Sequence, residues 1–171
     1  SILEHVARPF QYNIAQINLW EEANQLLRPV RHAGDDDYEQ ELAQTSSYGY
    51  KAGERFSGWI ITHRTHLLVS NIETATQVRP KLDRGEFPMQ SYLGVPLFAD
   101  QNFLGTLELV SYKANSYQPT DVMVLETIAS QAAIAIKNAQ SFAEQQQRVE
   151  ELSGLAEITR AIESTTDPYE L

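Results

Sequence analysis

Hydrophobic and polar positions alternate over residues 13–20, where Ala15, Ile17 and Leu19 stand between Ile14, Gln16, Asn18 and Trp20. This period of two predicts a strand with one strongly apolar face. A polar turn follows, and the pattern resumes over 26–30, which predicts the second strand of a hairpin. Residues 91–98 and 103–110 flank a polar turn over 99–102 and predict a second hairpin. Residues 67–69 predict a short strand between the two hairpins.

Helical spacing occurs near both ends of the chain and once in the middle. Residues 1–8 are typical of the end of a helix, which stops at Pro9. Ser57 is positioned to cap a short helix that begins near Gly58. A long helix is predicted after Pro119 and continues through Phe142. Beyond it, a narrower apolar stripe is typical of a helix that pairs with another helix, although Gly154 weakens its continuity; the stripe consists of Val149, Leu152, Leu155, Ile158 and Ile162.

Two antiparallel hairpins between terminal helices indicate an α+β fold. We expect a central antiparallel sheet of five or six strands with helices packed on one face, and a long C-terminal connector helix. Residues 73–90 are polar and show little periodicity. A long irregular segment inside a compact domain is usually a functional loop.

Composition limits the chemistry that is available to this fold. The chain has 171 residues, 42% of them hydrophobic, and no cysteine. This length fits one domain with residues to spare. The absence of cysteine excludes disulfides, thiolate nucleophiles, Cys-ligated zinc, iron–sulfur clusters and thioether-linked chromophores. No apolar run is long enough for a membrane span, and the first residue is Ser1. We expect a segment of a longer cytoplasmic protein, with no membrane insertion in this part.

The charge distribution argues against nucleic acid as a partner. There are 23 acidic and 13 basic residues, for a net charge of −10, and no long basic surface is encoded. The middle of the chain is locally basic, and a small anionic ligand would suit it; the residues concerned are Arg55, Arg64, Arg79, Lys81 and Arg84.

Four sequence segments together resemble a GAF domain, a sensory module common in bacterial signalling kinases, cyclases and phosphodiesterases. They are Gly53-Glu54-Arg55-Phe56-Ser57-Gly58-Trp59-Ile60, Ser91-Tyr92-Leu93-Gly94-Val95-Pro96-Leu97, Phe103-Leu104-Gly105-Thr106-Leu107-Glu108-Leu109 and the helix around 131–139. The resemblance implies a GAF-like domain over 1–142 with a truncated first helix. It implies a helical connector over 143–163 and the start of a following module over 164–171.

The resemblance implies a noncatalytic regulatory domain. Such a domain binds a small molecule or a neighbouring module and passes the signal through its terminal helices to an output domain. The resemblance implies a histidine kinase of a two-component system or a nucleotide cyclase as the output. It also implies a homodimer formed through the terminal helices, with adjacent sensory or output domains in the same chain. The alternative is a ligand-free structural module that serves for dimerisation or spacing.

The family's known ligands fit this sequence poorly. Of the signature of cyclic-nucleotide-binding members only Asp121 matches, and an acidic residue is also favoured at the start of a helix. Covalent bilin attachment and free methionine sulfoxide reduction both depend on cysteine in this family, so the resemblance excludes both. The identity of any cofactor stays open.

Candidate binding residues cluster around the segment that resembles the family's pocket, and they are Trp59, His63, Asn71, Arg79, Arg84, Ser91 and Tyr92. The competing interpretation makes Trp59 a core residue and the arginines solvent-exposed. His63 and His66 would share one face of a helix, which is the basis of a remote alternative, a metal-dependent enzyme. Polar residues at a helix end are the simpler interpretation. The acidic run Asp35–Asp37 is interpreted as a solvated loop.

Overall fold

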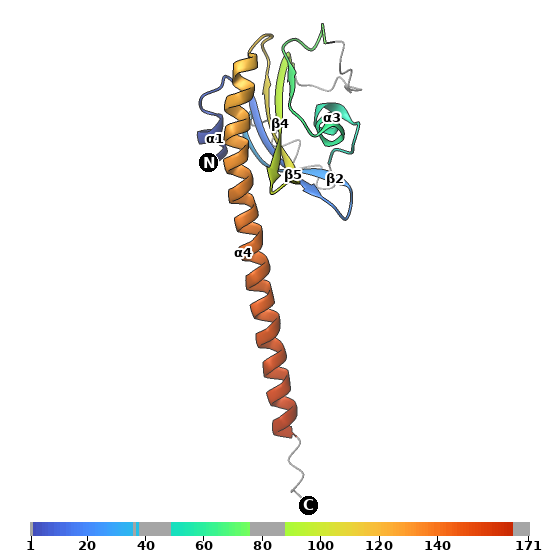
Figure 1. Ribbon diagram of the computed structural model, residues 1–171, viewed down its shortest axis with the longest axis vertical. Coiled ribbons are helices and arrows are strands. Elements are labelled where there is room, and N and C mark those ends of the chain that lie inside the picture. The colour runs from blue at the N-terminus through green and yellow to red at the C-terminus, as the bar shows by residue number, and fades with distance from the viewer. Residues whose placement is uncertain (1, 36, 38–48, 76–87, 166–171) are drawn as a thin grey trace, which may run out of the picture. The chain divides into compact units, whose positions relative to one another are not determined.

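The computed structural model describes residues 2–35, 37, 49–75 and 88–165 (Figure 1). The chain divides into two compact units, residues 1–133 and 134–171. The strands are β1 (Ile14–Glu21), β2 (Leu26–Gly34), β3 (Leu67–Val69), β4 (Ser91–Ala99) and β5 (Asn102–Ser111), and the helices are α1 (Ile2–Ala7), α3 (Arg55–His63) and α4 (Pro119–Thr165).

The five strands form one antiparallel sheet in the order β2-β1-β5-β4-β3. Both predicted hairpins are confirmed, and β2 is longer than the apolar pattern indicated, since its pairing continues to Gly34. Gly105 has a φ of 153°, and a Cβ there would overlap the Asn18 carbonyl oxygen on β1. Only glycine allows the two strands to approach this closely.

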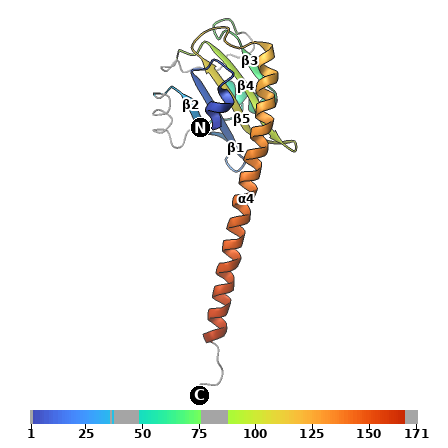
Figure 2. The ribbon, with the colours of Figure 1, turned by 90° about the vertical axis from the view of Figure 1, so that its left-hand side faces the viewer.

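Helices lie on both faces of the sheet in the first compact unit. α1 and the beginning of α4 lie on one face, and α3 lies on the other (Figures 1 and 2). The first face is apolar: Leu93, Val95, Leu97, Leu107 and Leu109 are all completely buried. The predicted fold, an antiparallel sheet of five or six strands with a long C-terminal helix, is confirmed with five strands. The expectation that the helices pack on one face is corrected, because α3 covers the second face (Figure 1).

The start of α3 differs from the prediction. The helix begins at Arg55, and Glu54 occupies the N-cap without a side-chain bond to the helix, so Ser57 is not a cap. Ser57 lies inside the first turn and is buried, and its Oγ donates a hydrogen bond to Glu108 Oε2 at 2.8 Å. The helix ends at His63, and the C-cap residue Arg64 has a left-handed φ of 56°.

α4 begins at Pro119. Proline is favoured at the first position of a helix because the N–H that it lacks would have no partner there. Within the first unit its buried residues recur at helical spacing: Val122, Leu125, Ala129 and Ala133. In the second unit, residues 134–164 are almost entirely exposed. No helix in the described ranges is long and apolar enough to cross a membrane. The boundaries proposed near 142 and 163 stay predictions, and residues 166–171 lie outside the described part.

Candidate functional site

The candidate site is the sheet face beneath α3, which combines an apolar cluster with a buried polar one. The apolar cluster joins α3 to β1, β3, β4 and β5, and consists of Ile14, Phe56, Ile60, Leu67, Val69, Tyr92 and Val110. The rings of Phe56 and Tyr92 lie 4.7 Å apart at their centroids. Five half-buried residues border this cluster: Trp59, Ile72, Ala75, Met89 and Tyr112.

The polar cluster surrounds the carboxyl group of Glu108 on β5. Asn18 Nδ2 donates to Glu108 Oε1 at 2.9 Å and to Thr106 Oγ1 at 2.9 Å. Thr106 also donates to Oε1, while Ser57 from α3 donates to Oε2. Gln16 donates to Asn18 Oδ1 and completes the cluster. The sheet register produces this arrangement, because Gln16 is paired with Glu108 and Asn18 with Thr106.

Burial dominates the electrostatics of this cluster. Glu108 is 5% exposed, and its removal from water raises the pKa of the carboxyl group. The donors Thr106, Ser57 and Asn18, together with the neighbouring Tyr92 hydroxyl, act in the opposite direction and lower the pKa. The three donors are neutral, so they solvate the carboxylate without cancelling its charge. The cluster therefore holds an acid that retains its proton to a higher pH than an exposed glutamate does.

Tyr92 adds a second buried polar group on the same face. Its hydroxyl is buried and has no hydrogen-bond partner among the described residues. Burial, together with the nearby Glu108, raises the pKa of the Tyr92 phenol. Gly94 makes room for this hydroxyl, since a Cβ at Gly94 would overlap it and would lie 2.6 Å from Ile60 Cδ1. The unpartnered hydroxyl and the buried acid are the chemically distinctive groups of this face.

Three of the predicted binding residues, Trp59, His63 and Tyr92, belong to this region. Trp59 and His63 lie one turn apart on α3, and their rings stack with centroids 3.9 Å apart and planes 12° apart. His63 Nδ1 lies 2.9 Å from the Trp59 carbonyl oxygen, which fixes the orientation of the imidazole. Trp59 packs against the cluster that contains Tyr92, so it is partly a core residue, as the competing interpretation held.

Of the other predicted residues, Asn71 and Ser91 are described by the structure, and both make local contacts outside the two clusters. Asn71 Oδ1 accepts a hydrogen bond from the Glu73 backbone at 2.9 Å, which shapes the turn after β3. Ser91 is adjacent to Tyr92 on β4, so the two side chains point to opposite faces of the sheet. Its Oγ donates to the Lys113 carbonyl oxygen at 2.7 Å. Arg79 and Arg84 lie outside the described residues.

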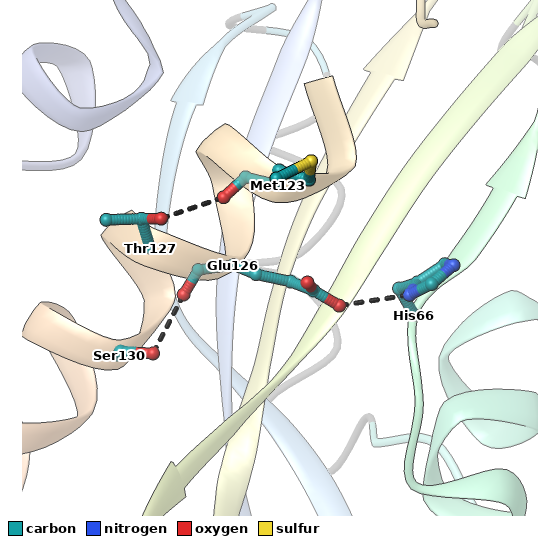
Figure 3. Close-up of polar contacts among 5 residues, drawn as sticks. All are labelled: His66, Met123, Glu126, Thr127 and Ser130. Atoms are coloured by element: carbon teal, nitrogen blue, oxygen red, sulfur yellow. Dashed lines mark hydrogen bonds and ion pairs between the residues drawn. The ribbon is translucent and has the colours of Figure 1, made fainter. Parts of the chain in front are cut away.

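His63 and His66 do not share a helix face, because α3 ends before His66. His66 lies in the connection to β3, and its Nδ1 is 3.0 Å from Glu126 Oε1 on α4 (Figure 3). The remote metal-enzyme alternative loses its geometric basis with this placement. Within the part of the chain that the structure describes, no three residues among His, Cys, Asp and Glu are grouped as metal ligands.

The acidic run also makes a structural contact. Asp35 Oδ2 accepts a hydrogen bond from the Tyr112 hydroxyl at 2.6 Å. Asn13 Oδ1 accepts the Tyr112 backbone N–H at 2.8 Å. These bonds attach the segment after β2 to the end of β5. The predicted solvated loop is therefore anchored at its first residue.

The sequence interpretation missed the polar cluster. It identified one strongly apolar face of β1 and left Gln16 and Asn18 on the other, but both are buried. The missed signal was the flanking pattern: these polar residues share their faces with apolar Ile14 on β1 and Val110 on β5. Polar residues bounded by core residues on two paired central strands indicate a buried network rather than a solvent-facing surface.

Comparison with known proteins places this geometry in a family. The family model described as "GAF domain" matches residues 1–137. No match to a curated protein was found.

Solved structures agree on the fold. The GAF domain from Acinetobacter phosphoenolpyruvate-protein phosphotransferase is 17% identical, with a TM-score of 0.68, over 84% of this chain and 82% of that one. GAF3 of a Synechocystis sp. protein, in its photoproduct state, is 17% identical, with a TM-score of 0.65, over 84% and 94%. Free methionine-R-sulfoxide reductase from Neisseria meningitidis, solved with its substrate, is 16% identical, with a TM-score of 0.62, over 81% and 77%. Identities this low show a shared fold alone.

Proposed function

The chain belongs to the GAF domain family, and on that basis we propose that it is a noncatalytic sensory module. In this proposal it binds a small molecule or a neighbouring module on the α3 face of the sheet. The signal then passes through the terminal helices to an output domain. A bound molecule changes the output only if it favours one of two arrangements of those helices.

The observation that carries this proposal is the double attachment of α3 and the loop that follows it. Near its start, α3 donates the Ser57 hydroxyl to the buried Glu108. After its end, His66 contacts Glu126 on α4 (Figure 3). A ligand that displaces α3 would therefore act at once on the interior of the site and on the first turns of α4.

The noncatalytic part of the proposal rests on the available side chains. The chain contains no cysteine, on which the family's sulfoxide reductases depend by the resemblance stated above. Glu108 is enclosed by Ser57, Asn18 and Thr106 and does not face solvent. In this proposal Glu108 serves to hold Ser57 of α3 and Asn18 of β1 in position through these hydrogen bonds.

The wider context is also a proposal. We expect the module to act in a cytoplasmic signalling protein, with a histidine kinase as the output domain and other sensory domains beside it. We expect a homodimer formed through the terminal helices. A small anionic ligand is proposed from the locally basic sequence that contains Arg79 and Arg84.

Native mass spectrometry of the freshly purified chain tests the sensory proposal, because a co-purifying small molecule would appear as a reproducible mass increment. Trp20→Phe leaves Trp59 as the only tryptophan. Adding a protein-free, small-molecule cell extract to this variant should change its fluorescence. Trp59→Phe, which retains Trp20, is the matched control and should not respond.

Hydrogen exchange tests transmission within the first unit. An extract that alters Trp59 fluorescence should slow exchange over 55–75 and over 119–133. In Glu126→Gln, which weakens the contact with His66, we expect protection of 55–75 to remain and that of 119–133 to fall. Equal protection of both segments in the variant would contradict transmission through this contact.

A ligand-free spacer is the second candidate, and the tight filling of the α3 face favours it. Phe56, Ile60 and Tyr92 are at most 3% exposed. No mass increment and no Trp59 response to extract would support the spacer. Turnover of free methionine sulfoxide with a thiol reductant would contradict both candidates, since both are noncatalytic.

A further inference from the structure

From Phe142 onward, α4 exposes a row of large apolar side chains. They are between 58% and 63% exposed, and they are Phe142, Val149, Leu152, Leu155, Ile158 and Ile162. Isolated exposed apolar residues are ordinary on a protein surface, but six in a regular series on one helix form a surface for another helix. The spacing within this series identifies the partner and the way in which it binds.

Two helices that wind around each other meet at positions spaced alternately by three and four residues, called a and d. Phe142 and Val149 are seven residues apart, so both take position a. Leu152 lies three residues after Val149 and takes position d. Gln145 then takes the d position between the first two. A polar residue in such a seam selects one alignment of the helices at some cost in stability.

The charges on α4 fit a second copy of the same helix. In a parallel pair in register, position g of one helix meets position e of the next heptad on the other. Here these pairs are Ser141 with Gln146 and Arg148 with Ser153, so no two like charges face each other. Glu144 and Arg148 lie four residues apart on the same helix, where an acidic residue before a basic one is favourable. The residues beside the apolar row therefore allow a second copy of the same helix to pack against it without charge repulsion.

The row changes register at Gly154. From Val149 to Ile158 the apolar residues are spaced by three, three and three, so one residue is missing from the alternation of three and four. On a helix of 3.6 residues per turn, each step of three falls about 60° short of a full turn. The row consequently moves around the helix over 149–158 instead of following one line.

Neither register alone keeps the seam apolar. The register of Val149 and Leu152, continued onward, brings Thr159 and Glu163 into the seam. The register of Leu155, Ile158 and Ile162, continued backward, brings in Arg148 and Glu151. A pair that buries the whole row must therefore change register between Leu152 and Leu155. Gly154 lies within this interval, and a Cβ there would meet no neighbouring atom within 4 Å. Because glycine has the most freedom in its backbone angles, a local change of helix winding is easiest at this residue.

We infer that α4 pairs in parallel and in register with α4 of a second copy of this chain, and that the seam between them changes register at Gly154. This inference rests on the dimer of the proposed function and adds its geometry. The two registers compete for the residues on either side of Gly154. A signal that favours one register would move the break and rotate the helix ends that follow, so the break is a two-state element.

Disulfide trapping tests the register directly, because the chain has no cysteine of its own. A disulfide requires Cα atoms roughly 4.4–6.8 Å apart, which seam positions of a parallel pair approach and outer positions do not. Leu152→Cys and Leu155→Cys should each form mostly disulfide-linked dimer under mild oxidation. Ala156→Cys and the outer control Glu157→Cys should remain mostly monomeric in a non-reducing gel. All four positions are exposed or replace small side chains, so the domain should fold in each variant.

The outcomes separate the break from the dimer. A yield for Ala156→Cys equal to or above that for Leu155→Cys, with Leu152→Cys still linked, overturns the register change and leaves the dimer in place. A monomer in sedimentation equilibrium, with no linkage at Leu152→Cys or Phe142→Cys, overturns the dimer and the break together. A dimer in sedimentation without linkage at either position overturns the parallel arrangement.

An insertion provides a second test without cysteine. One alanine inserted between Ser153 and Gly154 moves the three downstream apolar residues into the register of Val149 and Leu152. We expect the dimer dissociation constant to fall about tenfold, because the seam becomes continuous. The same alanine inserted between Gln145 and Gln146 is the matched control and should weaken the dimer. An unchanged or weaker dimer after the first insertion would overturn the break.

Discussion

The two faces of the sheet are built from alternate residues of the same strands, yet they differ sharply in chemistry. On the face towards α1 and α4, β4 and β5 contribute five completely buried aliphatic side chains, Leu93, Val95, Leu97, Leu107 and Leu109. On the face towards α3, Glu108 and Thr106 stand on β5 beside Asn18 on β1. The first face contributes hydrophobic stabilisation, whereas the second holds polar groups whose burial is costly unless they are hydrogen-bonded. A polar cluster retained against that cost is the reason for proposing the α3 face as the binding face.

The largest effect should come from the apolar face. Leu107 is completely buried beside Glu108 on β5 and points to the opposite side. Leu107→Ala should lower the free energy of unfolding by about 2–5 kcal/mol, because it removes apolar contacts and leaves a cavity. Urea denaturation measures this loss. Met123→Ala, at a residue that is 71% exposed, is the control and should cost less than about 0.5 kcal/mol.

A smaller loss is expected where the α3 face is tightly packed. Gly94→Ala should destabilise the protein by about 1–3 kcal/mol, since the added methyl group overlaps the Tyr92 hydroxyl. Tyr92→Phe removes that hydroxyl, which has no hydrogen-bond partner among the described residues, and alone should change stability by less than about 1 kcal/mol. The double variant should recover part of the loss. Additive effects of the two substitutions would show that the clash lies elsewhere.

The buried acid should make stability depend on pH in a defined direction. Burial raises the folded-state pKa of Glu108 above its unfolded value of about 4.5, so the folded state holds a proton that the unfolded state releases. The stabilisation is complete below pH 4.5 and is lost as the pH rises through the folded-state pKa. Glu108→Gln removes this titration, so its melting temperature relative to the wild type should increase steadily from pH 4.5 upward.

Glu73→Gln, at an exposed residue of the same unit, is the control for that series. Its melting curve should follow the wild type at every pH. A constant difference between Glu108→Gln and the wild type from pH 4.5 to 8 would mean that Glu108 titrates alike in both states. The buried cluster would then lack the electrostatic cost that distinguishes the α3 face.

Sequence patterns predicted the apolar half of this comparison better than the polar half. The hairpins, a sheet of five or six strands and the long helix followed from periodicity, because a core-facing residue recurs at the period of its element. The polar cluster depends on register: Gln16 pairs with Glu108 only after β1 and β5, which are distant in the sequence, are aligned. Ser57 was interpreted as a cap because its local position fits one, whereas its actual partner is 51 residues away. Local patterns carry no information about such partners.

The smallest effect on stability should come from the contact between the α3 side and α4. His66 and Glu126 are 44% and 47% exposed, and exposed ion pairs contribute little because water screens them. A double-mutant cycle with His66→Ala and Glu126→Ala should give a coupling energy below about 0.5 kcal/mol in thermal unfolding. A coupling above about 1 kcal/mol would make the pair a structural element of the domain. A small coupling energy, together with the loss of protection of 119–133 in Glu126→Gln, would assign the contact to signal transmission. The contact would then link the α3 face to α4 without stabilising either.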